Sequence, residues 1–310
     1  MIDFLKESLI FQHLLGIDAS FDFITGRAFA LEVKKNVNQN TNQSINQNTN
    51  IIQDNLNCEN KEYKDIRKDN TEKDITKKDT ENGSEKPTNK AVHQKKGLNS
   101  DVSVKINELK QELKSVNTFE ELVDKIKQYD GCELKRVAKN SVVFDGNCKS
   151  KIMLIGEAPG ETEDINGIPF CGQSGQLLRK VLNFINLSTT NGNLFITNTV
   201  FWRPPMNRKP EKDEIQICLP FVYKMIEIIN PKLVILCGST AISTFLIDVN
   251  KAGDAVGKFS DMNFELNGKK TCINSYSIYH PSFLLRNPIM KKTFWKHMLT
   301  LKEYLLKNNL

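Results

Sequence analysis

Residues that could do chemistry stand directly after an apolar run near the middle of the chain. The run KIMLI over residues 151–155 predicts a buried strand, and the turn GEAPG over residues 156–160 follows at once. Open α/β sheets bind their ligands at the carboxyl ends of parallel strands, and glycines there permit close approaches that a Cβ would block. Glu157 is therefore a candidate catalytic carboxylate. Three more acidic residues, for which we expect a helix start or a solvated face, are Glu161, Glu163 and Asp164.

Similar segments follow this turn and end the later strands. They are PFCGQSG over residues 169–175, ITNTVFWRPPMNR over 196–208, GST over 238–240 and HPSFLLR over 280–286. In a parallel sheet these loops share one edge. We therefore expect Glu157, Phe170, Asn198 and His280 to line a single pocket.

The elements that must position these residues alternate between strands and helices. Apolar runs predict strands over residues 151–155, 194–199, 232–237 and 272–279. Apolar stripes at helical spacing predict helices over residues 104–129, with a break at Asn117-Thr118, and over 174–187, 211–229, 239–247 and 291–308. This alternation indicates an α/β protein with three layers, α/β/α, around a central four-stranded parallel sheet.

Composition divides the chain into three parts. Residues 1–35 contain apolar residues at helical spacing, which predict a short N-terminal helical segment. Residues 36–100 are rich in Asn and Lys and poor in aliphatic clusters, which predicts a disordered linker. Residues 101–310 form the main domain. Residues 1–34 either bind a protein partner or pack back on that domain.

Charge and cysteine use narrow the classes of function. The formal net charge is +6, and this excess falls on residues 101–310, which suits a polyanionic partner but also many enzymes with small substrates. The seven cysteines form no Cys-x-x-Cys pair, so zinc ribbons and thioredoxin-like sites lack their signature. The odd count and the lack of a signal peptide predict a reducing, cytoplasmic location, and no apolar run reaches the length of a membrane span.

The motifs GEAPG, PFCGQSG, ITNTVFWRPPMNR and HPSFLLR, in this order, together resemble the family-4-type uracil-DNA glycosylases. The resemblance covers residues from about 130 to about 305 and says nothing of residues 1–100. It implies the uracil-DNA glycosylase fold and hydrolysis of the N-glycosidic bond of uracil in DNA, which initiates base-excision repair. Such an enzyme flips the nucleotide out of the stack and reads the base edge in a closed pocket.

The resemblance gives roles to the residues of the expected pocket. Phe170 would stack on uracil, and Asn198 offers a donor for uracil O4 and an acceptor for N3–H. His280 would donate to uracil O2 as negative charge grows there, and Glu157 would orient water or stabilise the sugar cation. The backbone positions that would line the pocket are Gly156 and Ala158. Taken without the motifs, Phe170 and His280 would more often be a core Phe and a structural His, Asn198 would as often cap the strand end, and Glu157 could be a hydrogen-bonded turn residue.

Further residues would contact the DNA. Leu284 or Leu285 would fill the gap left by the flipped base, with core packing as the alternative, and Arg286 would meet phosphate. Backbone N–H groups at the start of the helix capped by Ser174 would cradle another phosphate. The remaining DNA-binding candidates are Gly172, Gly175, Arg203, Arg208 and Ser282.

The chain departs from the family pattern at the cofactor. Typical members hold a [4Fe–4S] cluster on four cysteines. Here Cys132 and Cys218 stand at two of the ligand positions, but Lys135 and Trp202 occupy the other two. Two thiols do not hold such a cluster in the usual way, and the other cysteines do not match the missing positions. We therefore expect no metal and no diffusible cofactor.

Two other functions stay open. One is an enzyme of the same fold with a different range of deaminated bases, or one that captures DNA covalently. No histidine lies between Trp202 and Ile217, where a covalent-capture variant would carry its extra motif. The other is a non-catalytic DNA-binding module. The presence of all four expected pocket residues, Glu157, Phe170, Asn198 and His280, argues against it. We expect a monomer that acts on uracil-containing DNA.

Overall fold

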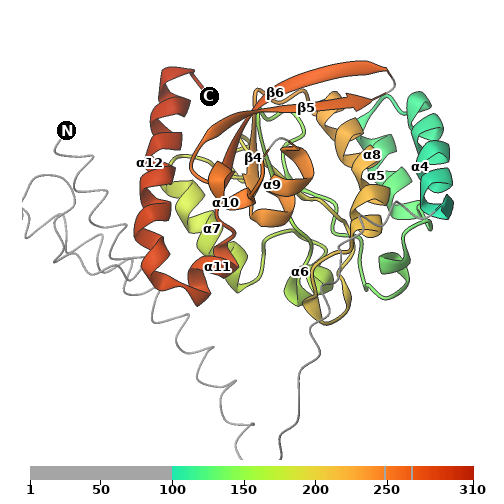
Figure 1. Cartoon of the computed structure of the whole chain (residues 1–310), viewed down its shortest axis with the longest axis horizontal. Helices are drawn as coiled ribbons and strands as arrows, with labels where there is room; N and C mark the ends of the chain where they lie inside the picture. The colour runs from blue at the N-terminus through green and yellow to red at the C-terminus, as the bar shows by residue number, and fades with distance from the viewer. Residues whose placement is uncertain (1–99, 248, 267) are drawn as a thin grey trace, which may run out of the picture. The chain divides into compact units, whose positions relative to one another are not determined.

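The fold is built on one mixed sheet with helices on both faces (Figure 1). The structure, a computed structural model, describes residues 100–310 apart from 248 and 267. The expected N-terminal helical segment, the linker as far as residue 99 and the partner-binding role of residues 1–34 lie outside the described residues.

The sheet of the described region has six strands in the order β1-β3-β2-β4-β6-β5. Their bounds are β1 (Asp145–Gly146), β2 (Ile152–Gly156), β3 (Phe195–Asn198), β4 (Leu233–Cys237), β5 (Phe259–Leu266) and β6 (Lys269–Ile278). The central strands β3, β2, β4 and β6 pair in parallel, as predicted. The predicted central four-stranded parallel sheet is thus confirmed, and two edge strands that were not predicted, β1 and β5, pair with it antiparallel.

The unpredicted edge strand β5 has the alternating pattern of a half-buried strand. Met262 and Phe264 face the core, while their neighbours along the strand are exposed. The pairing with β6 runs without a break from Phe259↔Tyr276 to Leu266↔Lys269. A search for apolar runs misses such a strand, because one of its faces is polar.

The strand register brings the ends of the central strands to one edge. Gly156 of β2 pairs with Asn198 of β3, and each is the last residue of its strand. At the same edge, Cys237 ends β4 beside Ile278, which ends β6. The four loops that were expected to share an edge therefore start there.

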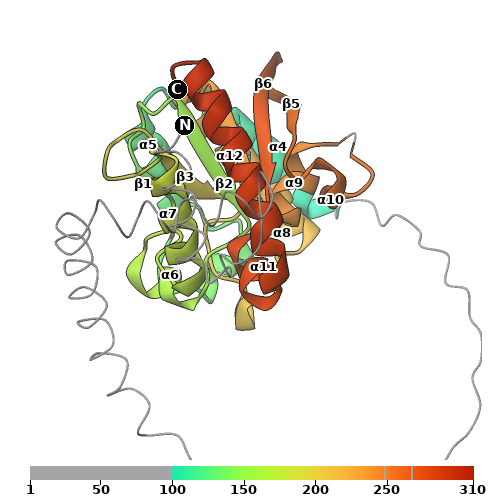
Figure 2. The ribbon, with the colours of Figure 1, turned by 90° about the vertical axis from the view of Figure 1, so that its left-hand side faces the viewer.

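The helices form two layers around the sheet (Figures 1 and 2). Their bounds are α4 (Ser100–Glu112), α5 (Phe119–Gln128), α6 (Glu161–Asn166), α7 (Gln173–Phe184), α8 (Lys212–Ile229), α9 (Ser239–Phe245), α10 (Ala252–Ala255), α11 (Pro281–Arg286) and α12 (Lys291–Lys307), with 3-10 turns at Leu113–Ser115, Glu133–Arg136, Pro205–Asn207 and Pro288–Met290. Helices α4, α5, α8 and α9 pack on one face, and α7, α11 and α12 pack on the other. Within the described part of the chain, no helix combines the length and the apolarity that a membrane crossing needs.

The apolar core is correspondingly split in two by the sheet. Along β2, Met153 and Ile155 belong to the cluster under α4, α5 and α8, whereas Ile152 and Leu154 belong to the cluster under α7 and α12. A strand buried on both faces reads as a continuous apolar run, which is why the central strands were predictable.

The break predicted within residues 104–129 is also present. Thr118 caps α5, with its hydroxyl accepting from the Glu121 N–H at 3.2 Å and the Glu121 carboxylate accepting from the Thr118 N–H at 3.2 Å. This reciprocal capping box satisfies donors that the helix itself leaves unpaired.

Candidate active site

The candidate site begins where three of the predicted residues meet at the end of β2. A Cβ on Gly156 would collide with Oδ1 of Asn198 and with the ring of Phe170. Only glycine allows both side chains to approach the strand end so closely. The structure therefore brings Gly156, Phe170 and Asn198 together, although they are far apart in the sequence.

The Asn198 side chain carries an unpaired polar atom in this pocket. Asn198 is buried, and its Oδ1 accepts no hydrogen bond from any described part of the chain. Buried acceptors are almost always paired, and leaving one unpaired costs about 1–3 kcal/mol. An amide oxygen held in this way is ready to accept a hydrogen bond from a ligand N–H.

His280 has a fixed proton arrangement. The backbone N–H of Ser282 donates to His280 Nδ1 at 3.2 Å, and the Ser282 hydroxyl lies 2.7 Å from the same nitrogen. A backbone N–H can only donate, so Nδ1 accepts and the ring proton of neutral His280 sits on Nε2. Burial lowers the pKa of His280, and Arg286 lowers it further, while Glu157 and Glu163 oppose that shift. Ser282, predicted to bind DNA, thus orients the imidazole.

Phe170 lies between the strand ends and His280. The centroids of the two rings are 6.0 Å apart. Phe170 is buried and has a φ of +55°, in the left-handed region that side chains other than glycine rarely adopt. Its backbone is packed against Gly175, where a Cβ would collide with the Phe170 carbonyl group. The local strain fixes the direction in which the ring points.

Glu157 is held by a residue that sequence reasoning missed. The Thr240 hydroxyl, in the first turn of α9, makes a short hydrogen bond to Glu157 Oε2. Glu157 is half-buried, and its charge opposes the lowering of the His280 pKa that burial causes. The GST segment after β4 was noted, but nothing in its spacing pointed to a partner 83 residues away. Ala158, beside it, is partly buried against the core.

Two acidic residues that were expected at a helix start or on a solvated face prove to be buried. Glu163 accepts from the Gly172 N–H at 2.7 Å and from the Gly160 N–H at 3.2 Å. Asp164 accepts from the backbone of residues 139 and 140 at 2.9 and 3.0 Å. The helix start, α6, is confirmed, but the solvated face is wrong for Glu163 and Asp164. Both carboxylates tie loops together.

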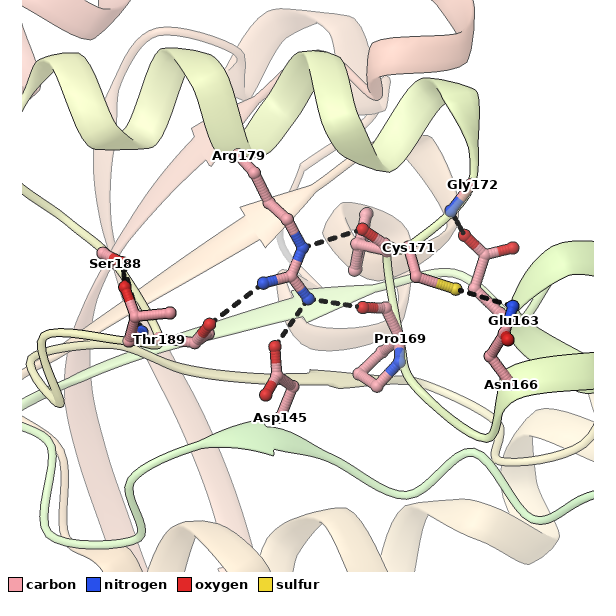
Figure 3. Close-up of polar contacts among 11 residues, drawn as sticks. Asp145, Glu163, Asn166, Pro169, Cys171, Gly172, Arg179, Ser188 and Thr189 are labelled. Carbon is pink, nitrogen blue, oxygen red and sulfur yellow. Dashed lines mark hydrogen bonds and ion pairs between the residues drawn. The ribbon is translucent and has the colours of Figure 1, made fainter. Parts of the chain in front are cut away.

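This arrangement also corrects the phosphate cradle expected around residues 172–175. The N–H of Gly172 is taken by Glu163 (Figure 3), so it does not face a phosphate. Gly175 is buried against Phe170 and is not on the surface. Ser174, half-buried in the first turn of α7, is the candidate of this segment that stays accessible.

The two leucines of α11 have different environments. Leu284 is 1% exposed and belongs to the core cluster under α7 and α12, so packing accounts for it. Leu285 is 38% exposed, and Arg286 is exposed beside it. Of the predicted wedge residues, Leu284 is thus corrected to a core residue, and Leu285 is left to contact a partner.

The two arginines of the proline-rich loop already have partners. Arg203 donates to Asn207 at 2.8 Å and lies 3.6 Å from Glu161. Arg208 makes a two-pronged ion pair with Glu214, at 2.6 and 2.8 Å, which raises the pKa of Arg208. A phosphate would have to compete with these carboxylates, most strongly at Arg208.

The residues at the family's cluster positions do not fit an iron–sulfur cluster. Cys132 and Cys218 are buried in the same apolar cluster, and burial holds the pKa of Cys218 well above its ordinary value. Trp202 fills the same core and donates from Nε1 to Ser141 at 2.9 Å, while Lys135 is paired with Asp130 at 2.8 Å. Residues 100–310, as far as they are described, hold no group of three or more side chains able to ligate a metal.

Taken together, the site offers an aromatic ring, an amide with a free acceptor, a neutral imidazole donor and a carboxylate at one sheet edge. An aromatic face and an amide recognise a planar base with polar edges. A preorganised imidazole N–H stabilises negative charge that develops on an oxygen. A carboxylate stabilises a neighbouring cation or orients water. The arrangement suits the breaking of a bond between a base and a sugar.

Comparison with known proteins agrees with this chemistry. The family described as the uracil DNA glycosylase superfamily matches residues 143–301. A type-4 uracil-DNA glycosylase of Saccharolobus solfataricus is 38% identical over 184 residues, which are 59% of this chain and 85% of the relative. Proteins of the same name are 36% identical in Pyrobaculum aerophilum, over 58% of this chain and 91% of the relative, and 37% identical in Thermotoga maritima, over 55% and 86%.

Proposed function

Because the chain belongs to the uracil-DNA glycosylase superfamily, we propose that it hydrolyses the N-glycosidic bond of uracil in DNA and so initiates base-excision repair. The observation that carries this proposal is the unpaired Oδ1 of Asn198, buried beside Gly156 and Phe170. Uracil supplies the missing partner, because its N3–H is a donor that no neighbouring atom of the pocket replaces.

The reaction assigns a role to each pocket residue. The flipped uracil stacks on Phe170, Asn198 Oδ1 accepts from N3–H, and Asn198 Nδ2 donates to O4. His280 donates from Nε2 to O2, where charge grows as the bond between C1′ and N1 breaks. Glu157, fixed by Thr240, stabilises the cationic sugar and orients the water that adds to C1′. The base leaves as an anion, and the proton that the added water gives up goes to it, so that the products are uracil and an abasic site.

The DNA contact is proposed at the surface beside the pocket. Leu285 enters the gap left by the flipped nucleotide, and Arg286 meets the backbone. Ser174 and Arg203 extend this contact. We propose that the protein acts as a monomer. The described cysteines are free thiols, which suits a reducing compartment such as the cytoplasm.

We also propose that the enzyme works without an iron–sulfur cluster or another cofactor. Trp202 and Lys135 stand where two ligands would be needed, and the remaining thiols face each other in an apolar core. None of the pocket roles above depends on a metal.

A strand-cleavage assay tests the proposal. Duplexes carrying U·G or U·A are incubated with excess enzyme, and abasic sites are revealed with hot alkali. Uracil release is expected, with a thymine duplex left intact. A duplex carrying hypoxanthine tests the broader base range. Absence of abasic sites above a buffer control would refute the glycosylase and leave the non-catalytic DNA-binding module.

A further inference from the structure

Arg179 of α7 makes a set of hydrogen bonds that the pocket roles do not yet include. Its side chain is 27% exposed and reaches from the helix to the loop before it (Figure 3). Nε donates to the Phe170 carbonyl at 2.8 Å, and Nη2 donates to the Pro169 carbonyl at 2.8 Å. The guanidinium is itself fixed by Asp145 at 2.6 Å and by the Thr189 hydroxyl at 3.0 Å.

The loop that Arg179 holds is strained. The left-handed conformation costs about 1–2 kcal/mol for a residue with a Cβ, and Phe170 adopts it. Such a conformation persists only where the surroundings over-determine it. The rigid, planar guanidinium of Arg179 donates to two consecutive carbonyls, those of Pro169 and Phe170. Gly175 has no Cβ, which lets α7 pack closely against the Phe170 backbone. A lysine in place of Arg179 offers a single point of charge and no such fork.

We propose that Arg179 is a positioning residue of the base pocket, which keeps the Phe170 ring at the place where uracil stacks. The proposal rests on the proposed function, because a stacked base is what makes the ring direction matter. Arg179 does not touch the base. It acts through the Pro169–Phe170 backbone, and Asp145 and Thr189 hold the guanidinium in the orientation that this requires.

The competing explanation is that Arg179 only stabilises the fold through its ion pair with Asp145. Two variants distinguish these explanations from each other. Arg179→Lys keeps the charge beside Asp145 but loses the fork to the two carbonyls. Asp145→Asn removes the ion pair but keeps an acceptor for the guanidinium, which stays bonded to the loop. The exposed pair Arg136–Glu133, at 3.0 Å, supplies Arg136→Lys as a matched control.

The experiment is a double-mutant cycle between Arg179→Lys and Phe170→Leu, measured by single-turnover uracil release from a U·G duplex. Inhibition by free uracil and the melting temperature are measured in parallel, and the rate and inhibition assays are run at one temperature below the melting temperature of the wild-type protein. If Arg179→Lys melts below the assay temperature, Arg179→Gln, which keeps one donor for a loop carbonyl, takes its place.

Arg179→Lys is expected to lower the rate and weaken uracil inhibition, each by roughly 10-fold to 100-fold, because small misplacements in a pocket cost up to about that much. In the Phe170→Leu background the same change should have almost no further effect on either quantity. Arg136→Lys should leave uracil inhibition unchanged, and Asp145→Asn, whose amide oxygen can still accept from the guanidinium, should weaken it less than Arg179→Lys does. Equal losses in both backgrounds, or unchanged uracil inhibition by Arg179→Lys, would overturn the proposal. A wild-type protein that releases no uracil would instead overturn the proposed function.

Discussion

Asn198 Oδ1 is an acceptor that the fold buries without giving it a donor. An unpaired buried acceptor is destabilising, and its pairing with the N–H of a base contributes binding free energy. The residue beside it in β3 behaves in the opposite way. The Thr197 hydroxyl is buried and donates to the Val143 carbonyl at 2.7 Å, so it serves the fold.

Asn198→Ala should therefore lower single-turnover uracil release by about 10²–10³-fold with little change in melting temperature, since Oδ1 forms no bond to lose. Thr197→Val is the matched control. It should lower the free energy of unfolding by about 1–3 kcal/mol, through the unpaired Val143 carbonyl, and leave the rate almost unchanged. An Asn198→Ala protein with full activity would return Asn198 to a structural role.

We expect the lowered pKa of His280 to set the acid limit of the reaction. Burial keeps the ring neutral below the ordinary imidazole value of 6.5, and the neutral form is the one held by the Ser282 N–H. We expect the single-turnover rate to stay flat as pH falls from neutrality to 6.5 and to decline only below it. His280→Asn, which keeps a donor but does not titrate, should lack this decline. A decline that starts above 6.5, or that persists in the variant, would contradict the assignment.

The lowered pKa of His280 also makes the folded state less stable at acidic pH. The unfolded chain binds the His280 proton more tightly than the native one, so acidification below 6.5 favours unfolding. The pH profile should thus be recorded together with the melting temperature at each pH.

Residues at the ends of strands could be predicted as site residues from the sequence. Residues whose roles depend on partners far away in the sequence could not. Asn198 and His280 stand at strand ends, where an α/β sheet exposes its chemistry. Thr240 and Arg179 were missed because their partners, Glu157 and Asp145, lie 83 and 34 residues away. No local pattern encodes such pairs.

At the scale of elements, the short helix α11 places two neighbouring leucines in different environments. Its first residue, Pro281, is buried, and the helix turns Leu284 towards the core and Leu285 outwards. The sequence FLL could not settle this, because the direction depends on how the six-residue helix sits on α7.

The two leucines should respond differently to truncation. Leu284→Ala should lower the free energy of unfolding by about 2–5 kcal/mol, as for other buried leucines. Leu285→Ala should change stability by only about 0.5 kcal/mol but slow uracil release from a duplex. The slowing should be smaller on a single strand, where no stack has to be filled. Equal effects of Leu285→Ala on both substrates would argue against a wedge.

The sheet edges mark another limit of sequence reasoning. The central strands are apolar on both faces and stand out, whereas β1 has only two residues and β5 is half polar. The burial of the Glu163 and Asp164 carboxylates was not predicted, for a related reason. An acidic cluster looks solvated in a sequence, and only the folded loops reveal the backbone N–H groups that it serves.

At the scale of the whole molecule, the layer made by α4 and α5 is joined to α8 through the apolar cluster that contains Cys132, Trp202 and Cys218. The family's cluster would tie this layer on by covalent ligation. We propose that a buried indole and two thiols provide this packing in the present chain.

The protein should accordingly purify without colour and without iron, and chelators should not lower its melting temperature. Trp202→Cys should destabilise the fold and still bind no iron, because Lys135 stands at the remaining position. Metal analysis and the absorbance spectrum provide the measurement. A brown protein with about four irons per chain would contradict the expectation.

Because Trp202 is buried, its fluorescence reports on the unfolding of the protein. The chain has two tryptophans, Trp202 and Trp295, each 1% exposed and each in a different apolar cluster, on opposite faces of the sheet. Trp202→Phe and Trp295→Phe therefore leave a single fluorophore in one layer or the other. In urea, each variant's emission shift should coincide with its loss of circular dichroism if the two layers unfold as one unit. Separate midpoints would instead identify the layer that opens first.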